Sequence, residues 1–309
     1  MFKHLLVPLD GSRLAESALP AAAYLAKALE ATVTLIHVIE KDPPSEVHSE
    51  RHLTTPEEAQ AYLSEVASQA FSPNIRVERH VHISGVSDVA RSVVEHSAEL
   101  APDLVIMCTH GRSGPRDWLF GSIAQQVIAL GSTPVLLVRP VDDDTPPSFT
   151  CRKLLVPLDG DVEHEQGMPA AIGLAQSLGS EMHLLMVVPT LGTLAGEDAA
   201  TGKLLPGATA ALLDLAELGG EEYLRHHLVR LNSAGIKTTA EVARGDPAAT
   251  IVEVAHRVDA DLIVLGTHGK TGTEAFWSGS VAPKISSRYH VPLLLVPLYM
   301  AGEGGSSDI

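Results

Sequence analysis

Glycines in the stretch LGTHGKTGTEAFWSGS, residues 265–280, are spaced so that their backbone amides could bind phosphate groups. Gly266 and Gly269 are separated by two residues, and Gly279 and Ser280 follow after nine more. Glycine lets the backbone approach a ligand and adopt positive φ without steric cost, and inward-pointing amides form an anion-binding nest. The residues from Gly279 onward predict a helix, whose first N–H groups and dipole favour phosphate. The spacing therefore predicts a phosphate site.

Other residue types near this stretch could complete such a site. The hydroxyl of Ser280 adds a donor, and Lys270 supplies positive charge. Asp159 could accept hydrogen bonds from a ribose or an adenine edge, or hold a divalent cation beside the phosphates. Val187 could form an apolar wall for a base. A glycine-rich turn alone is weak support, however, and Asp159 could instead cap a helix or turn, as His268 could be a structural turn residue.

An earlier copy of the same stretch differs at one telling position. There the spacing reads Cys108, Gly111, Gly121 and Ser122, with Arg112 in the place of the lysine. Cys108 replaces the first glycine, so a Cβ and a sulfur stand where the ligand would approach. The first copy is therefore the weaker candidate, and whether it binds a ligand stays open.

The two copies belong to a duplication of a whole domain. Three segments recur in the same order: KHLLVPLDGS (3–12) as RKLLVPLDGD (152–161), PDLVIMCTHGRSG (102–114) as ADLIVLGTHGKTG (260–272), and TPVLLVRP (133–140) as VPLLLVPL (291–298). The repeat length excludes a short-period solenoid. The resulting division is a first domain at 1–140, an acidic, proline-bearing linker at 141–150, a second domain at 151–298, and a disordered tail at 299–309.

Each domain alternates short apolar runs with longer helical patterns. In the first domain we expect strands at 3–9, 32–39, 75–83, 103–108 and 134–138, and helices at 12–30, 56–70, 87–100 and 122–130. The second domain repeats this pattern with a Gly- and Ala-rich insertion between about 190 and 218. Such alternation predicts an α/β fold with a mostly parallel sheet covered by helices on both faces.

Ligands of open α/β sheets bind beyond the carboxyl ends of the strands, where the strand order reverses. We hypothesise the flavodoxin-like order 3-2-1-4-5 for each five-stranded domain, which places the reversal between strands 1 and 4. These are the strands that end in the two best-matched repeats, VPLDG and VLGTHG. The topology therefore predicts that Asp159 and the glycine stretch face the same ligand.

Composition excludes several classes of partner. The formal net charge is −16, which disfavours nucleic acid and anionic membrane surfaces. No apolar run reaches the about 20 residues that cross a bilayer. Two cysteines, Cys108 and Cys151, do not support a disulfide framework, so we expect a cytoplasmic protein. No set of nucleophile, base and orienting group emerges, so we expect no catalytic residues.

These motifs, in this order, resemble the ATP-binding type of the universal stress protein family, over nearly the whole chain and in both halves. The resemblance implies two flavodoxin-like, Rossmann-like domains, bound ATP with Mg²⁺ or Mn²⁺, a role in stress signalling, and little or no catalysis. In the second domain it implies that nucleotide contacts come from Pro157, Leu158, Asp159, Val187, Gly266, Thr267, His268, Gly269, Lys270, Gly279, Ser280 and Val281. The less certain first-domain set is Pro8, Leu9, Asp10, Val38, Cys108, Gly111, Arg112, Gly121, Ser122 and Ile123.

Two other functions stay open beside nucleotide binding. The chain could be a protein-interaction module that kept the fold and lost the ligand, or a slow ATPase. An NAD-dependent dehydrogenase is excluded by position, because its glycine fingerprint should follow the first strand. The family also pairs through its last strand, and the two closing strands are apolar, so we expect the halves to pair as an intramolecular pseudo-dimer, with a homodimer possible.

Overall fold

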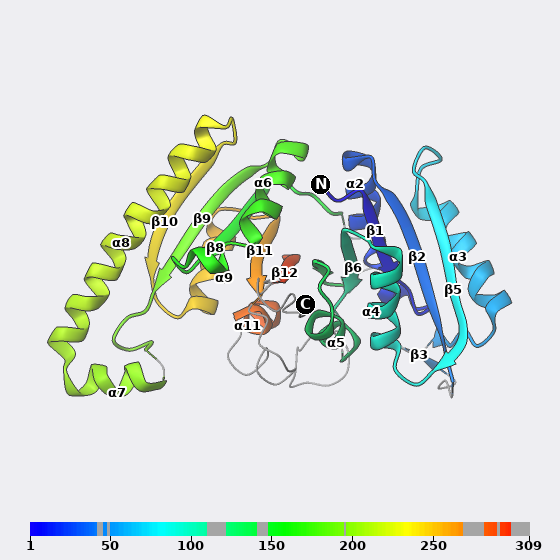
Figure 1. The fold of residues 1–309 in the computed structure, drawn as a ribbon, viewed down its shortest axis with the longest axis horizontal. Coiled ribbons are helices and arrows are strands. Elements are labelled where there is room, and N and C mark those ends of the chain that lie inside the picture. Colours follow the sequence, from blue (N-terminus) through cyan, green and yellow to red (C-terminus); the bar gives the residue numbers. More distant parts are fainter. Residues whose placement is uncertain are drawn as a thin grey trace, which may run out of the picture.

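The computed structural model describes residues 1–41, 46–47, 50–109, 122–140, 148–194, 196–267, 281–288 and 291–297. Within these residues, ten strands form one sheet in the order β10-β9-β8-β11-β12-β7-β6-β1-β2-β5 (Figure 1). The first-half strands are β1 (His4–Pro8), β2 (Thr32–Glu40), β5 (Val77–Val86), β6 (Leu104–Cys108) and β7 (Val135–Val138). The second-half strands are β8 (Lys153–Leu158), β9 (Glu181–Val188), β10 (Thr238–Arg244), β11 (Leu262–Thr267) and β12 (Leu293–Pro297). Each half is parallel with the order 3-2-1-4-5, which confirms the predicted fold class.

Helices cover both faces of this sheet, and each face has its own buried apolar cluster. The helices of the first half are α1 (Arg13–Glu16), α2 (Leu19–Leu29), α3 (Pro56–Ala70), α4 (Val89–Leu100) and α5 (Ser122–Leu130). Those of the second half are α6 (Gly167–Leu178), α7 (Gly196–Leu204), α8 (Pro206–Ser233), α9 (Pro247–Arg257) and α11 (Val281–Arg288), with a 3₁₀ turn at Val162–His164. One cluster includes residues of α2, α3, α6 and α8, and the other includes residues of α4, α5, α9 and α11.

The structure corrects one of the predicted elements and shows the form of the insertion. The helix expected at 12–30 is divided, because α1 ends at Glu16 and α2 begins at Leu19 with Pro20 in its first turn. A proline inside one continuous helix would remove a backbone hydrogen bond, whereas it is tolerated in a first turn. The insertion between 190 and 218 is largely helical, forming α7 and the beginning of α8.

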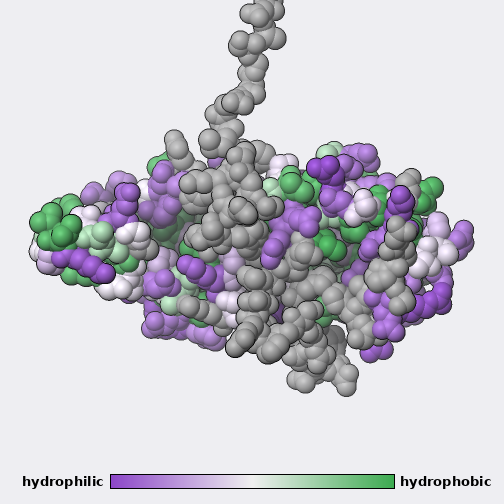
Figure 2. Space-filling model, turned by 90° about the horizontal axis from the view of Figure 1, so that it is seen from below, coloured by the Kyte–Doolittle hydropathy of each residue, from purple (hydrophilic) through white to green (hydrophobic). Residues whose placement is uncertain are grey.

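The beginning of α8 and the adjoining α7 expose apolar side chains. Leu204 is 80% exposed and Leu205 is 60% exposed, and three further leucines of α8 are exposed to a similar extent: Leu212, Leu215 and Leu218. Figure 2 shows apolar residues gathered at this end of the molecule. These side chains do not contribute to the core, so the contribution of α8 to the core comes from its later turns, including Leu224 and Leu231.

The two halves meet where β7 pairs with β12 in antiparallel orientation. Leu136 lies opposite Leu294 in this register, and both side chains are 1% exposed. Both apolar clusters contain residues of both halves, so the core continues across this seam. Arg139 adds a hydrogen bond from its guanidinium to the Ser286 carbonyl, at 3.5 Å. The pairing removes two apolar sheet edges that would otherwise be open to another chain.

We predict that the seam contributes directly to stability. Leu294→Ala should lower the free energy of unfolding by about 2–5 kcal/mol, because it leaves a cavity in a fully packed layer. The double variant with Leu136→Ala should cost less than the sum of the two single changes, because the two side chains share one contact. Urea denaturation followed by circular dichroism measures all three values. If the two single losses of unfolding free energy added up to the loss in the double variant, Leu136 and Leu294 would not share a contact across the seam.

Candidate functional site

Strands 1 and 4 of the first half are hydrogen-bonded only near their beginnings. The β1–β6 ladder pairs Leu5 with Leu104 and Leu6 with Val105, and goes no further. The N–H of Leu9 donates to the Ile36 carbonyl of β2, at 2.9 Å. Because N–H groups alternate between the two sides of a strand, Pro8 faces β6, and proline has no N–H to donate. The ladder therefore ends at the predicted strand reversal.

The second half repeats this arrangement. The β8–β11 ladder pairs Leu154 with Leu262 and Leu155 with Ile263, and Pro157 stands at the next position facing β11. The predicted residues Leu158 and Asp159 follow this proline at the carboxyl end of the strand. In both halves the sequence VPLD thus brings its aspartate to the point where the two central strands stop pairing.

The turn after strand 1 requires glycine in both halves, but the aspartates are held differently. Gly11 has φ +92° and Gly160 has φ +87°, which is the region that glycine adopts without strain. In the first half, the Asp10 carboxylate accepts hydrogen bonds from the Ser12 N–H at 2.9 Å and from its hydroxyl at 2.6 Å. Ser12 in turn caps α1. Asp10 therefore takes part in the turn itself.

In the second half, Asp161 replaces the capping serine and the aspartate is more open. The Asp159 carboxylate accepts a hydrogen bond from the Asp161 N–H at 3.0 Å and lies 2.5 Å from Nδ1 of His164. Its side chain remains 50% exposed. A carboxylate in this position can still accept hydrogen bonds from the hydroxyl groups of a ligand.

A buried polar network fixes the segment that follows this aspartate. Glu165 accepts a hydrogen bond from the Tyr223 hydroxyl at 2.6 Å and lies 3.2 Å from Nε2 of His227. Burial and the Glu165 carboxylate both raise the pKa of the Tyr223 hydroxyl. The network joins the start of α6 to α8, so it positions the turn that carries Asp159.

Strand 4 ends differently in the two halves. A Cβ placed on Gly167, at the start of α6, would lie 3.2 Å from the backbone nitrogen of Gly266. Alignment of the repeats puts Ala18 and Cys108 at the corresponding positions of the first half. The second half thus lacks both Cβ atoms where helix and strand approach, and Gly266 stays partly exposed, whereas Cys108 is buried.

Several predicted residues lie at these strand ends, and others lie outside the described residues. Val38 is buried at the end of β2, its counterpart Val187 is partly buried at the end of β9, and the Thr267 hydroxyl donates to the Val296 carbonyl at 3.4 Å. Ser122 begins α5, Ile123 is partly buried beside it, and Val281 begins α11. Outside the described residues lie Gly111, Arg112, Gly121, His268, Gly269, Lys270, Gly279 and Ser280.

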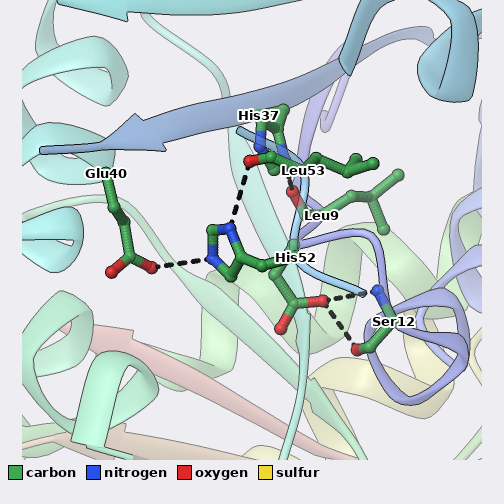
Figure 3. A network of polar contacts seen from close by, with 7 residues as sticks. Leu9, Ser12, His37, Glu40, His52 and Leu53 are labelled. Carbon is green, nitrogen blue, oxygen red and sulfur yellow. Dashed lines mark hydrogen bonds and ion pairs between the residues drawn. The ribbon is translucent and has the colours of Figure 1, made fainter. Parts of the chain in front are cut away.

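Two buried histidines near the first-half site escaped prediction. Nδ1 of His37 lies 2.7 Å from the Leu9 carbonyl, and His37 is 1% exposed. His52 is also buried, with its Nε2 3.2 Å from the Glu40 carboxylate and its Nδ1 3.1 Å from the Leu53 carbonyl (Figure 3). Burial lowers the pKa of His37, and the nearby His52 lowers it further. The one signal in the sequence was a polar residue inside a buried strand, where the second half has Met186.

A second histidine cluster lies at the outer strand of the first half. Nδ1 of His82 is 3.2 Å from Nε2 of His96, whose Nδ1 donates to the Ser92 carbonyl at 2.7 Å. The ring of His80 is centred 4.7 Å from that of His96. Burial lowers the pKa of His80, and the two neighbouring imidazoles add to this effect, while Glu99 opposes it. Among the described residues no group of His, Cys, Asp or Glu is arranged to hold a metal ion.

The fold and the repeated strand-end motifs define a tandem α/β protein of the doubly wound class. The sequence model of the universal stress protein family matches residues 1–139 and 150–297. The chain belongs to the universal stress protein family, with two family domains in tandem. No helix among the described residues is long and apolar enough to span a membrane.

Relatives support the tandem organisation. A universal stress protein E homolog of Haemophilus influenzae is 26% identical over 322 residues, covering 95% of this chain and 96% of that protein. A universal stress protein of Methanocaldococcus jannaschii is 32% identical over 148 residues, which is 47% of this chain and 81% of that protein. The crystal structure of a universal stress protein from Archaeoglobus fulgidus has the same fold, with a TM-score of 0.67, 17% identity and 97% of each chain covered.

Both thiols should be unreactive in the folded protein. Burial raises the pKa of Cys108 to about 12, with Asp10 adding to the effect, and burial raises that of Cys151 to about 12. Because the thiolate is the reactive form, labelling by a disulfide reagent at pH 8 should be slow in the native protein and should reach both thiols in urea. Rapid native labelling of Cys108 would show that its side chain faces solvent at the site.

Stability should fall as the pH falls below about 6.5, the ordinary pKa of histidine. The pKa values of His37 and His80 are lowered in the folded state, so the unfolded chain binds more protons in this range. The loss begins as the pH falls through the ordinary value and is complete below the lowered one. Replacing His80 by glutamine should reduce the pH dependence of the urea midpoint, whereas the same change at the exposed His226 should leave it unaltered. Equal effects of both changes would refute this assignment.

Proposed function

We propose that the chain is an adenine-nucleotide-binding protein of the stress response, and that its second half holds the primary site. The observation that carries this proposal is the end of β11, where Gly266 and Gly167 lack side chains beside an open aspartate turn. The spacing of Gly266, Gly269 and Gly279, which suits phosphate, supports it further.

The described residues of the second half fit such a ligand. Asp159 is half exposed and would accept hydrogen bonds from ribose hydroxyl groups. Val187, partly buried at the end of the neighbouring strand, would pack against the base. The glycine stretch would supply amide donors, and Lys270 the positive charge that an acidic chain otherwise lacks there. A bound Mg²⁺ or Mn²⁺ would neutralise part of the phosphate charge.

This proposal assigns the chain a binding and regulatory role. The described strand ends contain no nucleophile held by a base and an orienting group, so no residue is assigned to hydrolysis. For the first half, the buried Cys108 favours the second hypothesis, in which a domain keeps the fold and exchanges its ligand role for protein contacts.

Calorimetry with ATP and Mg²⁺ tests the proposal directly. Gly266→Cys should weaken binding at least tenfold, because it places a Cβ and a sulfur against the start of α6 and in the path of the ligand. The same change at Gly219, where a Cβ would meet no described atom within 4 Å, is the matched control and should leave the affinity unaltered. Absence of ATP binding by the unmodified chain would refute the function.

A further inference from the structure

The end of the first strand is covered in the first half and open in the second. Leu9 is 3% exposed and Ser12 is fully buried, whereas their counterparts Leu158 and Asp161 are partly buried and exposed. The two turns have the same sequence, VPLDG, and the same positive φ at glycine. The difference therefore comes from what packs against them.

The covering side chains are His52 and Leu53, which belong to the segment 50–53 that we call the strap. Leu53 lies over the turn, since a Cβ placed on Gly11 would be 3.0 Å from its Cγ and Cδ1. In the second half, the described atoms within 4 Å of a Cβ on Gly160 all belong to Met186 of the adjacent β9. The connection that follows β9 takes another path, into α7 and α8.

Polar contacts hold the strap at both of its sides. His52 is buried against the Glu40 carboxylate at the end of β2, and Figure 3 shows it beside His37, Leu9 and Leu53. Towards α3, Arg51 forms an ion pair with Glu58, which also accepts a hydrogen bond from the Thr54 N–H at 3.3 Å. These contacts make the strap a fixed part of the first half.

His37 is the member of this network whose hydrogen bonding is incomplete. Nε2 of His37 is buried without a hydrogen-bond partner among the described residues, directly beneath the strap. The strap is thus held over the turn by His52 and Leu53, and it encloses the His37 ring.

We propose that His52 and Leu53 decide which half takes the nucleotide, by covering the strand end that carries Asp10 while its counterpart Asp159 stays open. This inference rests on the proposed function and adds a determinant that the glycine motif does not contain. Restoring glycine at position 108 alone does not open the first half, because the strap covers strand 1 and not strand 4.

The test uses a chain in which the two motifs are exchanged, Cys108→Gly with Gly266→Cys, so that the first half gains the glycine and binding by the second half is weakened. With the strap intact, calorimetry should detect ATP–Mg²⁺ binding at least tenfold weaker than after His52→Ala and Leu53→Ala are added. The matched control is Leu191→Ala, which removes an exposed leucine from the connection after β9. It should leave the affinity of the exchanged chain unaltered.

Hydrogen exchange provides a readout that does not depend on nucleotide. Amides of residues 9–12 should exchange faster after the two strap changes, while those of 158–161 should not change. Equal ATP affinity with and without the strap, or unaltered exchange at 9–12, would overturn the inference alone. Absence of ATP binding by the unmodified chain would overturn the proposed function and this inference together.

Discussion

A missing backbone N–H near the end of each first strand determines where the two central strands of each half separate. Pro8 and Pro157 face the fourth strand and cannot continue the ladder, so the two central strands separate beyond Leu6 and Leu155. Elsewhere in a buried parallel sheet such a residue would leave a carbonyl without its donor. Here it lies at the reversal of strand order, where the aspartate turn and the glycine stretch follow the strands. The site is thus set by the backbone before any side chain contributes.

The pairing of β7 with β12 gives the two copies one sheet and two continuous cores. Because each half contributes a closing strand to this seam, the sheet edges that remain are β5 and β10. Both carry polar and charged residues that bond to their neighbours, such as Glu241 with His183 at 2.9 Å. Such edges are poor templates for another strand. The seam therefore pairs the two apolar edge strands, and the two polar edge strands remain at the outside of the sheet.

The fold followed from the sequence because its strongest signals were local and duplicated. The VPLDG runs identify strand 1 in each half, and TPVLLV and VPLLLV identify strand 5 of the first and second halves. Their order requires parallel crossovers. The break between Glu16 and Leu19 was not predicted. Pro20 lies in the first turn of α2, but the good helix formers around it favour one continuous helix. The insertion at 190–218 was recognised from its Gly- and Ala-rich composition, but no helix was predicted within it. It forms α7 and the beginning of α8, whose later part packs against the core.

The candidate site was less accessible to sequence reasoning, because its decisive contacts join residues that are far apart in the chain. Gly167 was not among the predicted site residues, because the lack of a Cβ there matters only through its approach to Gly266, 99 positions later. His37 and His52 have no counterparts in the second half, so comparison of the copies could not assign them a shared role. The place of His37 and His52 beside the first turn becomes evident only when the two folded copies are compared. The two turns have the same VPLDG sequence but differ in burial. Among the described residues, this difference lies in the strap, which packs against the turn of the first half.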